Sequence, residues 1–523
     1  MADRLPYVAQ RYRKSPEQLE KIFLNDNDLA LDHSENLFYS CSFVTNSDNT
    51  ENVSNETIQK AIVPYDQTFL LHSNPGATKV IYLDFDGHTT TATPWNEWSL
   101  IDPIVSLPYD TDDDTSTFSD TELGRIQNIW ARVAEDFIFY DVDVTTADPG
   151  AEALEKTNQG DKYYGIRTVI SPSNWAGYIG GIAFIDSFKF DVDTPVFVFY
   201  ANFHTTDENY AAEPASHEIG HALGLYHDGK GTKPYYWGHG QWGPIMGVAY
   251  AKPVSQWSKG EYPDATNTED DLAIMSLVGG FDYRPDDCGN TIASAKHLTA
   301  NPTINAKGII EKNTDADVFS FTTGSGNITI TAEPQGPKPN LDILIELLKP
   351  DGIVIAQADN FTVATETLNA NLSAGTYYIR ISGVGDVDYT DYASLGRYTL
   401  QAAVVPTNST ISIEPKTINT NSPGQWITCN IKIPDGYTIA DIDKSSIRLA
   451  DLVTAQHIQI NPGQQTVTAK FDRAIVIDTL ILQEGLDRNG GFNIFANVKV
   501  TGQLNDATPF EGTDKIRLMH NTK

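Results

Sequence analysis

The stretch "SHEIGHALGLYHDG", from Ser216 to Gly229, carries three histidines and one glutamate in a short segment. In a helix, residues four apart lie on one face, so His217 and His221 present two imidazoles to one point, as a tetrahedral metal requires. Glu218 follows the first histidine and is near enough to reach a metal-bound water without being a ligand. The pattern predicts a zinc site on a helix, with a carboxylate beside it.

The third ligand must come from beyond this helix, and His227 and Asp228 are both candidates. His227 lies about 600° around a helix axis from His221, which is well off the face that the first two histidines share. Gly224 lies between them and can take the left-handed conformation that ends a helix and turns the chain. We therefore predict that the helix ends at Gly224, a turn that could bring His227 back to the metal.

With histidines at positions 217, 221 and 227, the stretch resembles the metzincin zinc proteases, and Asp228 after the last histidine is similar to their adamalysin branch. The resemblance implies that Asp228 is a structural partner in the turn and not a ligand. It implies that Glu218 is the general base. The zinc ligands that it implies are His217, His221 and His227.

Metzincins also have a Met-turn, a methionine-bearing turn beneath the metal, and Met246 in "GPIMGVAY" is the candidate here. Some metzincins carry a tyrosine two residues after this methionine, where it can approach the metal. In this chain that position is Val248, and Tyr250 lies two residues further on, so we do not expect Tyr250 to act as such a switch. We expect His239, in "YYWGHGQWGP", to be a loop or cleft-wall residue and not a fourth ligand.

The chemistry that follows is metal-assisted peptide hydrolysis. Three neutral histidines leave zinc one open position for a water, whose pKa the metal lowers while it polarises a carbonyl. Glu218 would take the proton of this water and pass it to the leaving amine. The strand expected in "GGIAFIDSF" could be the edge along which an extended peptide lies, or an ordinary interior strand.

The predicted function is that of a zinc-dependent endopeptidase acting on proteins. The alternative is a catalytically inactive metal-binding protein that attaches to a surface or a polymer. Retention of Glu218 beside all three histidines favours the enzyme, because an inactive descendant has no use for a base next to an open metal position.

The chain divides into four regions by composition. Residues 1–76 are polar and uneven and form a leader, which would be the propeptide of a zymogen. In this leader a capping box at Ser15 predicts a short helix, and the Ser/Asn/Thr-rich run after Cys41 predicts loop or disorder. Residues 77–283 alternate strands and helices, with a second capping box at Ser119. They predict a metzincin-like α+β catalytic domain, a mixed twisted sheet with an active-site helix.

Residues 286–404 and 408–523 predict two all-β sandwiches, because short alternating segments are separated there by Gly, Pro and Asn turns. The first resembles the bacterial pre-peptidase C-terminal domain in "TDADVFSF", "NLDILIEL" and "LSAGTYYIRISG". That resemblance implies a secreted bacterial protease, in which such domains are often removed during maturation. The second is similar only to generic accessory β-domains. A surface or a polymer is the kind of ligand that the sandwiches could bind.

The chain of 523 residues is too long for one hydrophobic core and carries a net charge of −33. This charge argues against nucleic acids and anionic membranes as partners. No apolar run reaches the roughly 18 residues of a membrane span. The N-terminus shows no apolar signal-peptide core, although the predicted chemistry favours a secreted, extracellular protein. Protein and peptide substrates are the partners that we expect.

The three cysteines, Cys41, Cys288 and Cys429, are far apart and offer no disulfide framework, so each is expected to pack as a small hydrophobe. In cysteine-switch metzincins a leader thiolate blocks the catalytic zinc. The sequence "FYSCSF" around Cys41 lacks the Pro-Arg-Cys-Gly context of those leaders, so we do not expect Cys41 to act in this way.

Two acidic segments could bind calcium in addition to zinc. The first is the run from Asp110 to Asp114, which as a solvated loop would need no cation. The second contains Asp315 and Asp317, which more ordinarily would begin a strand.

Overall fold

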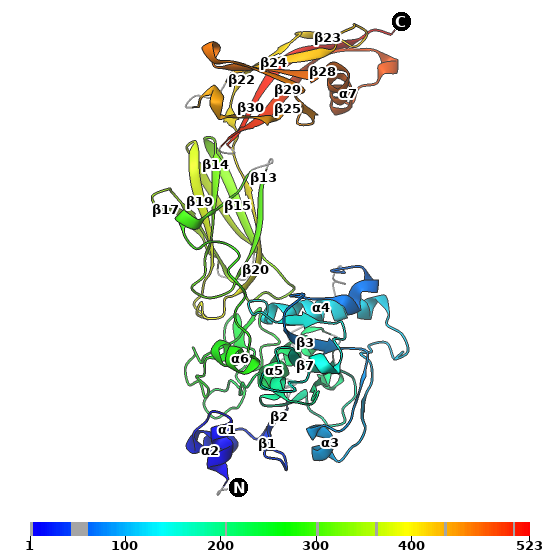
Figure 1. Cartoon of the computed structure of the whole chain (residues 1–523), viewed down its shortest axis with the longest axis vertical. Helices are drawn as coiled ribbons and strands as arrows, with labels where there is room; N and C mark the ends of the chain where they lie inside the picture. Colours follow the sequence, from blue (N-terminus) through cyan, green and yellow to red (C-terminus); the bar gives the residue numbers. More distant parts are fainter. Residues whose placement is uncertain are drawn as a thin grey trace.

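The protein is described here by a computed structural model that covers residues 4–42, 61–203, 205, 207–299, 303–360, 365–432, 437–505 and 508–522. The molecule is elongated and consists of three bodies in a row (Figure 1). An α/β body containing the N-terminus lies at one end, and two β-rich bodies follow in sequence order. This agrees with the predicted multidomain fold class at that level. None of the described helices has the length and apolar character that a transmembrane helix requires.

One seven-stranded sheet organises the α/β body, in the order β1-β2-β8-β9-β7-β3-β6. Five of its strands come from beyond the leader: β3 (Lys79–Asp84), β6 (Asp143–Thr145), β7 (Tyr164–Ile170), β8 (Gly181–Phe184) and β9 (Val196–Val198), with β6 at one edge. All of these strands run parallel to one another except β8, which is antiparallel to β9. Their apolar runs are buried on both faces, as expected for parallel strands covered by other layers.

The leader forms the outer edge of this sheet. Strand β2 (Leu37–Cys41) pairs antiparallel with β8, and β1 (Leu29–Leu31) pairs antiparallel with β2. Up to residue 42 the leader is thus part of the α/β body, whereas the sequence indicated only a polar and uneven segment. The loop or disorder predicted for the Ser/Asn/Thr-rich run falls on residues 43–59, which lie outside the described residues.

Helices cover the sheet where the capping patterns predict them. Helix α2 (Pro16–Asn25) begins at the capping box of Ser15, and α4 (Asp120–Asp136) begins at that of Ser119. Helix α5 (Asn209–Ala222) packs against α4 and contacts β7, β8 and β9. The other helices of this body are α1 (Leu5–Arg11), α3 (Pro94–Ser99) and α6 (Asp271–Gly279). The short strands are β4 (His88–Thr90), β5 (Ile104–Ser106), β10 (Trp242–Pro244) and β11 (Val254–Gln256).

The middle body contains two sheets, as the alternating segments predict. The strands of the five-stranded sheet, in spatial order, are β12 (Lys296–His297), β14 (Asp317–Thr323), β19 (Gly375–Gly383), β16 (Ile343–Leu348) and β17 (Val354–Ala358). Those of the four-stranded sheet are β13 (Thr303–Ile310), β20 (Gly396–Ala403), β15 (Gly326–Pro334) and β18 (Glu366–Leu372).

The C-terminal body also contains two sheets, together with a helix that the all-β prediction lacks. Helix α7 (Arg473–Gln483) begins where the Asp472 carboxylate accepts hydrogen bonds from the main-chain N–H groups of Ala474 and Ile475. The six-stranded sheet, in the order β21-β30-β29-β25-β26 with β23 paired to β30, contains β21 (Thr407–Asn408), β30 (Pro509–His520), β29 (Phe492–Leu504), β25 (Ile442–Leu449), β26 (Val453–Thr454) and β23 (Thr417–Asn419). The four-stranded sheet contains β22 (Thr410–Glu414), β24 (Trp426–Lys432), β28 (Thr466–Asp472) and β27 (His457–Asn461).

Candidate metal centre

Helix α5 and the turn after it hold the three predicted histidine ligands. His217 and His221 lie one turn apart on the helix, and both side chains are buried. The helix ends at Ala222 with Leu223 as its C-cap, and Gly224 follows with φ of +94°. The main-chain N–H of Leu225 then returns to the carbonyl of Gly220 at 3.0 Å, which closes the turn.

Gly224 is required at this turn for two reasons. Its positive φ is unfavourable for residues with a side chain, and a Cβ there would lie 2.7 Å from Arg13, 2.8 Å from Asp186 and 2.9 Å from Val278.

We expect Gly224→Ala to lower the free energy of unfolding by about 2–4 kcal/mol, measured by chemical denaturation. Gly177→Ala is the matched control, because Gly177 has φ of +99° and no atom within 4 Å of the added Cβ. Equal losses in both variants would show that crowding at Gly224 contributes nothing.

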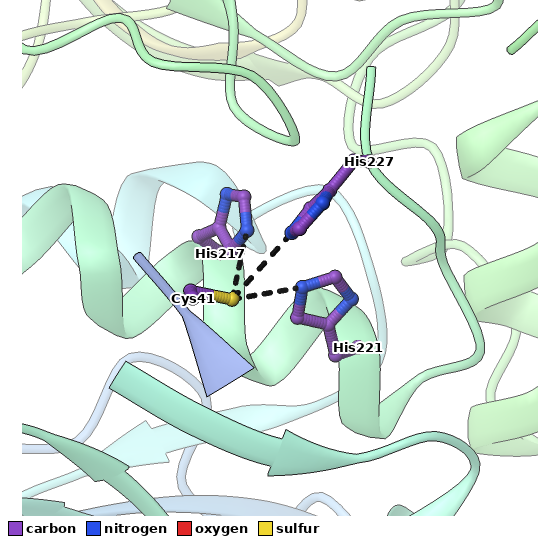
Figure 2. Close-up of side chains that lie close together, drawn as sticks. All are labelled: Cys41, His217, His221 and His227. Carbon is purple, nitrogen blue, oxygen red and sulfur yellow. Dashed lines mark hydrogen bonds between the residues drawn. The ribbon is translucent and has the colours of Figure 1, made fainter. Parts of the chain in front are cut away.

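The Nε2 atoms of the three histidines converge on the thiol of Cys41 (Figure 2). The Cys41 Sγ atom lies 3.7 Å from Nε2 of His217, 3.5 Å from that of His221 and 3.5 Å from that of His227. All four side chains are buried, and their ligand atoms lie within 4.8 Å of one another.

This donor set fits a zinc ion. Imidazole nitrogen and thiolate sulfur are the ligands that zinc prefers, at about 2.0 and 2.3 Å. Tetrahedral bonds of these lengths place the sulfur about 3.5 Å from each nitrogen. The observed sulfur–nitrogen separations of 3.5 to 3.7 Å match those that a four-ligand zinc centre would have.

Hydrogen bonds at Nδ1 orient each imidazole toward the centre. Nδ1 of His217 donates to the Ile245 carbonyl at 2.8 Å, and that of His221 donates to the Leu225 carbonyl at 2.9 Å. Burial lowers the pKa of His217 to about 3 and that of His221 well below its usual value. Both rings are therefore neutral at physiological pH, with a free Nε2 lone pair, which is the form that binds metals.

Carboxylates of the leader complete the surroundings of the third histidine. Nδ1 of His227 donates to the Asp26 carboxylate at 2.7 Å, and both side chains are buried. The Tyr235 hydroxyl donates to Asp28 at 2.7 Å, and the Tyr235 ring lies 4.2 Å from the ring of His227. No local sequence pattern indicates these contacts, because Asp26 and His227 are far apart along the chain.

Glu218 lies beside the centre, as predicted, but is not one of the four converging residues. It is fully buried, and neither carboxylate oxygen has an N–H or O–H partner among the described residues. Burial raises its pKa well above the usual value, and the Cys41 thiol opposes this effect. A Cβ on Gly181 would lie 2.3 Å from the carboxylate, so the first residue of β8 must be glycine for Glu218 to fit.

The turn below the centre contains Met246 and Asp228. A Cβ on Gly220 would lie 2.5 Å from the Met246 sulfur, so this methionine packs directly under α5 between the two helical histidines. Asp228 holds the turn through its main chain: its N–H donates to the Met246 carbonyl at 2.8 Å, and its carbonyl accepts from Tyr236 at 2.7 Å. The Asp228 carboxylate is not among the converging ligands, and burial raises its pKa well above the usual value.

Cys41 is where the structure departs most from the sequence analysis. Cys41 was expected to pack as an ordinary small hydrophobe, and it lies instead at the point where all three imidazoles meet. It reaches that point because β2 pairs with β8 and places Cys41 opposite Gly181. The Tyr39 ring, two residues earlier on the same face, stacks on the ring of His221 at 4.2 Å.

The other candidates are not among the four converging residues. Tyr250 packs against the rings of Phe203 and Tyr210. The ring of His239 shares a hydrogen bond of 2.8 Å with the Tyr236 hydroxyl, outside the metal group. Cys288 and Cys429 are buried and unpaired, as expected.

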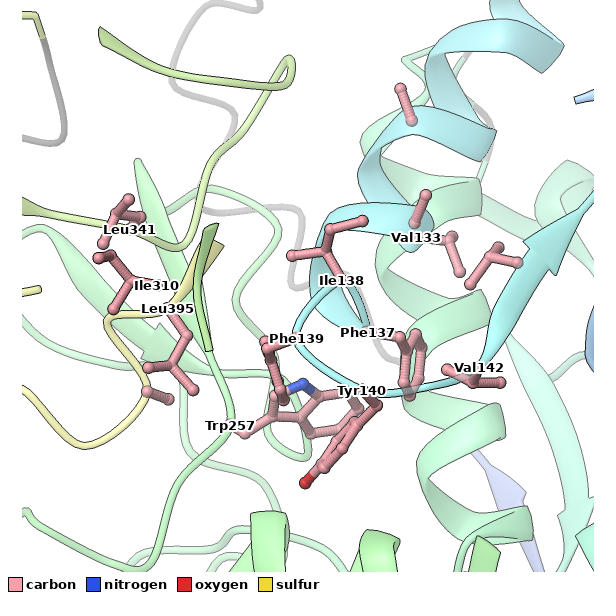
Figure 3. Close-up of a cluster of buried hydrophobic side chains, with 14 of the residues drawn as sticks. Val133, Phe137, Ile138, Phe139, Tyr140, Val142, Trp257, Ile310, Leu341 and Leu395 are labelled. Carbon is pink, nitrogen blue, oxygen red and sulfur yellow. The ribbon is translucent and has the colours of Figure 1, made fainter. Parts of the chain in front are cut away.

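The middle body packs directly against the end of α4 and the segment around Trp257 (Figure 3). Phe137, Phe139 and Trp257 of the α/β body share one hydrophobic cluster with Ile310, Leu341 and Leu395 of the middle body. The middle body is therefore docked through a continuous core and not merely linked by a flexible segment.

Polar contacts extend this interface to α5. The Asp136 carboxylate accepts hydrogen bonds from Ser216, the residue before His217, at 2.5 Å and from Asn340 of the middle body at 2.9 Å. Lys338 forms an ion pair with Glu213 of α5. The middle body thus contacts and stabilises the helix that carries the first two histidines.

Comparisons with known proteins give one family match. The model of the reprolysin-like metallopeptidases of family M12B matches residues 140–228, a range that includes α5 and all three histidines. This supports a zinc-dependent protease domain at the family level for that part of the chain.

Three solved structures are similar to this chain at low sequence identity. The pre-peptidase C-terminal domain of collagenase from Bacillus anthracis is 19% identical, covers 23% of this chain and 99% of its own, and has a TM-score of 0.16. The periplasmic lysozyme inhibitor PliG from Aeromonas hydrophila is 14% identical, with 21% and 98% covered and a TM-score of 0.16. A Bacillus licheniformis lipase in its propeptide form is 12% identical, with 88% and 95% covered and a TM-score of 0.15. At these TM-scores the three similarities establish neither a fold nor a function for this chain.

Proposed function

We propose that the protein is a zinc-dependent endopeptidase produced with a leader that closes its own active site. The observation that carries this proposal is the convergence of three Nε2 atoms on one point, with the Glu218 carboxylate beside it. His217, His221 and His227 would hold the zinc, and Glu218 would be the general base. The match to reprolysin-like metallopeptidases supports the reaction class.

The residues around the centre have separate tasks in this reaction. Zinc, when bound, supplies polarisation of the scissile carbonyl and acidification of a water. Glu218 is placed to take a proton from a water at the position of the Cys41 sulfur and to pass it to the leaving amine. The imidazoles keep their orientation through the Nδ1 hydrogen bonds described above, and Met246 supports α5 from below.

Strand β8 offers its edge to an extended peptide. At present β2 uses this edge, with Phe38 opposite Phe184 and Cys41 opposite Gly181. A substrate that replaces β2 would form the same main-chain hydrogen bonds and would bring a peptide bond to the level of Gly181, next to the zinc ligands. The leader is then a propeptide, and its departure opens both the edge and the centre.

Secretion and the tasks of the other bodies belong to the same proposal. An endopeptidase kept closed by its own leader suits export before activation. We expect the middle body to stay attached after maturation, because its loss would leave the buried Asp136 without Asn340. A surface or a polymer remains the proposed ligand class for the β-rich bodies.

The proposed function is tested by assaying hydrolysis of an unstructured protein, such as casein, by the chain from which the leader has been removed. Hydrolysis should stop on addition of a chelator and return on addition of zinc. The alternative, an inactive metal-binding protein that attaches to a surface or a polymer, predicts bound zinc without hydrolysis.

A second cation site is proposed in the middle body, where Asp286, Glu311 and Asp315 place their ligand atoms within 4.8 Å of one another. Glu311 is 2% exposed, and neither of its oxygens has an N–H or O–H donor among the described residues. Asp317, the other acidic residue of this segment, accepts instead from the Tyr398 hydroxyl. Oxygen ligands of this kind suit calcium.

The pH dependence of this site should be measurable. Burial and the neighbouring Asp315 raise the pKa of Glu311 to about 9. The folded chain then binds more protons than the unfolded chain between the usual glutamate pKa and 9, so its stability falls as the pH rises through this window. Calcium replaces the proton, so we expect it to raise the melting temperature of the chain more at pH 8 than at pH 5. Glu311→Gln should abolish this difference, and a calcium effect that persists in this variant would place the ion elsewhere.

The other acidic segment gives no such indication. Asp110, Asp112 and Glu122 lie close together, but Glu122 is engaged in capping α4 and accepts from the N–H groups of Thr111 and Ser119. The loop is mostly exposed, in agreement with a solvated segment.

A further inference from the structure

The three candidate zinc ligands differ in what orients them. His217 and His221 donate their Nδ1 protons to main-chain carbonyls of the α/β body, at Ile245 and Leu225. His227 donates instead to a side chain of the leader, the Asp26 carboxylate, at 2.7 Å. The leader therefore orients one of the three candidate zinc ligands, His227, and the proposed activation would remove this contact.

Asp26 is held firmly in this position. It lies at the end of α2, where its N–H donates to the Ile22 carbonyl at 2.8 Å. One carboxylate oxygen accepts from the N–H of Asp28 at 3.2 Å, and the other accepts from His227. The Asp26 and His227 side chains are only 8% and 2% exposed, so water does not screen their hydrogen bond.

Two ion pairs dock this part of the leader on the α/β body. Arg13 bonds both oxygens of Asp186, at 2.7 and 3.0 Å, and Lys14 bonds Glu269 at 2.6 Å. The carboxylate is thus delivered by an element that is anchored independently of the centre.

A carboxylate on Nδ1 has a defined effect on a histidine ligand. It fixes the proton on Nδ1, aims the Nε2 lone pair at the metal and makes that nitrogen a stronger donor, and loss of such a partner typically weakens metal binding about 10- to 100-fold. The same buried carboxylate without His227 would be an uncompensated charge, so each group requires the other.

We propose that the leader also strengthens metal binding, with Asp26 as the residue that positions His227 for zinc. This inference rests on the proposed function in that it takes the four-residue cluster as a zinc centre. The leader then acts in two ways: Cys41 closes the centre, and Asp26 organises it. When the leader leaves, the enzyme gains an open position and loses this acceptor for His227, so the full chain binds zinc more tightly than the activated enzyme does.

The test is the zinc affinity of the full chain, measured by competition with a chelating dye. We expect Asp26→Ala to weaken zinc binding about 10- to 100-fold. Asp32→Ala is the matched control, because the Asp32 carboxylate accepts its hydrogen bonds from Ser34 and Asn36 within the leader and none from a histidine. We expect this control to bind zinc as the unaltered chain does.

A spectroscopic measurement separates positioning from general loosening of the leader. In the cobalt-substituted chain, each ligand imidazole contributes one exchangeable N–H proton resonance that the metal shifts. Asp26→Ala should speed the exchange of the His227 N–H proton with water and leave the N–H resonances of His217 and His221 unchanged. Asp26→Asn, which keeps an acceptor but no charge, should have an intermediate zinc affinity.

The possible outcomes are distinct. Weaker zinc binding in Asp26→Ala with unchanged binding in Asp32→Ala supports the proposal. Unchanged binding in Asp26→Ala, or equal losses in both variants, overturns it while the proposed protease stands. An unaltered chain that binds no zinc overturns the proposed function itself, and with it this inference.

Discussion

Replacement of Glu218 by glutamine is expected to lower kcat for casein hydrolysis by about 10²- to 10⁴-fold, the usual contribution of a general base. The measurement belongs in the Cys41→Ala background, in which the centre is open. Glutamine keeps the size of the side chain, so the tight contact with Gly181 is preserved, but it cannot take a proton.

The same variant should retain its metal, because Glu218 lies beside the four converging residues and is not one of them. Zinc content of one ion per chain, with KM close to that of the parent, would show that only proton transfer has been lost. Hydrolysis at the parental rate by the zinc-loaded Glu218→Gln chain would remove Glu218 from the mechanism and leave the base unidentified.

Cys41→Ala in the full chain is expected to raise hydrolysis at least about 100-fold over the unaltered chain. A metal–thiolate bond is worth no less than a hydrogen bond to a charged group, about 3 kcal/mol, and that loss shifts the equilibrium between the closed and open centre by about 100-fold. The initial rate with casein at equal zinc loading measures this effect.

Cys288→Ala is the matched control, because Cys288 is also buried and unpaired but lies in the hydrophobic cluster shared with the middle body. It should leave the rate unchanged. Strand β2 still pairs with β8 in Cys41→Ala, so a further increase is expected when the leader is cut away. A Cys41→Ala chain no more active than the unaltered one would mean that the thiol does not close the site.

The histidines and the glutamate could be predicted from the sequence because their geometry is local. A helix fixes the relation of His217 to His221, and one glycine fixes the turn that returns His227. The capping boxes at Ser15 and Ser119 likewise indicated helix starts that the structure confirms, because each box involves residues only three apart.

The rest of the centre depends on contacts that no local pattern encodes. Cys41 and Asp26 reach the histidines only through the pairing of β2 with β8 and the docking of α2. The sequence around Cys41 lacks the context of known inhibitory leaders, so only its position in space reveals it. The ion pair of Lys338 with Glu213 is of the same kind, since it depends on how two bodies pack.

Helix α7 could not be predicted for a different reason. Its residues Arg473 to Gln483, "RAIVIDTLILQ", are rich in β-branched and other apolar side chains, a composition also typical of strands. The Asp472 cap was the available local signal, but the surrounding alternation of strands outweighed it.

The most direct test of the central claim is casein hydrolysis by the zinc-loaded Cys41→Ala chain, compared with the same chain after chelation and after readdition of zinc. We expect new casein N-termini to appear with zinc, to stop forming with the chelator and to form again when zinc is restored. Absence of casein cleavage both in the Cys41→Ala chain that holds one zinc per molecule and in the zinc-loaded chain after removal of its leader would contradict this claim.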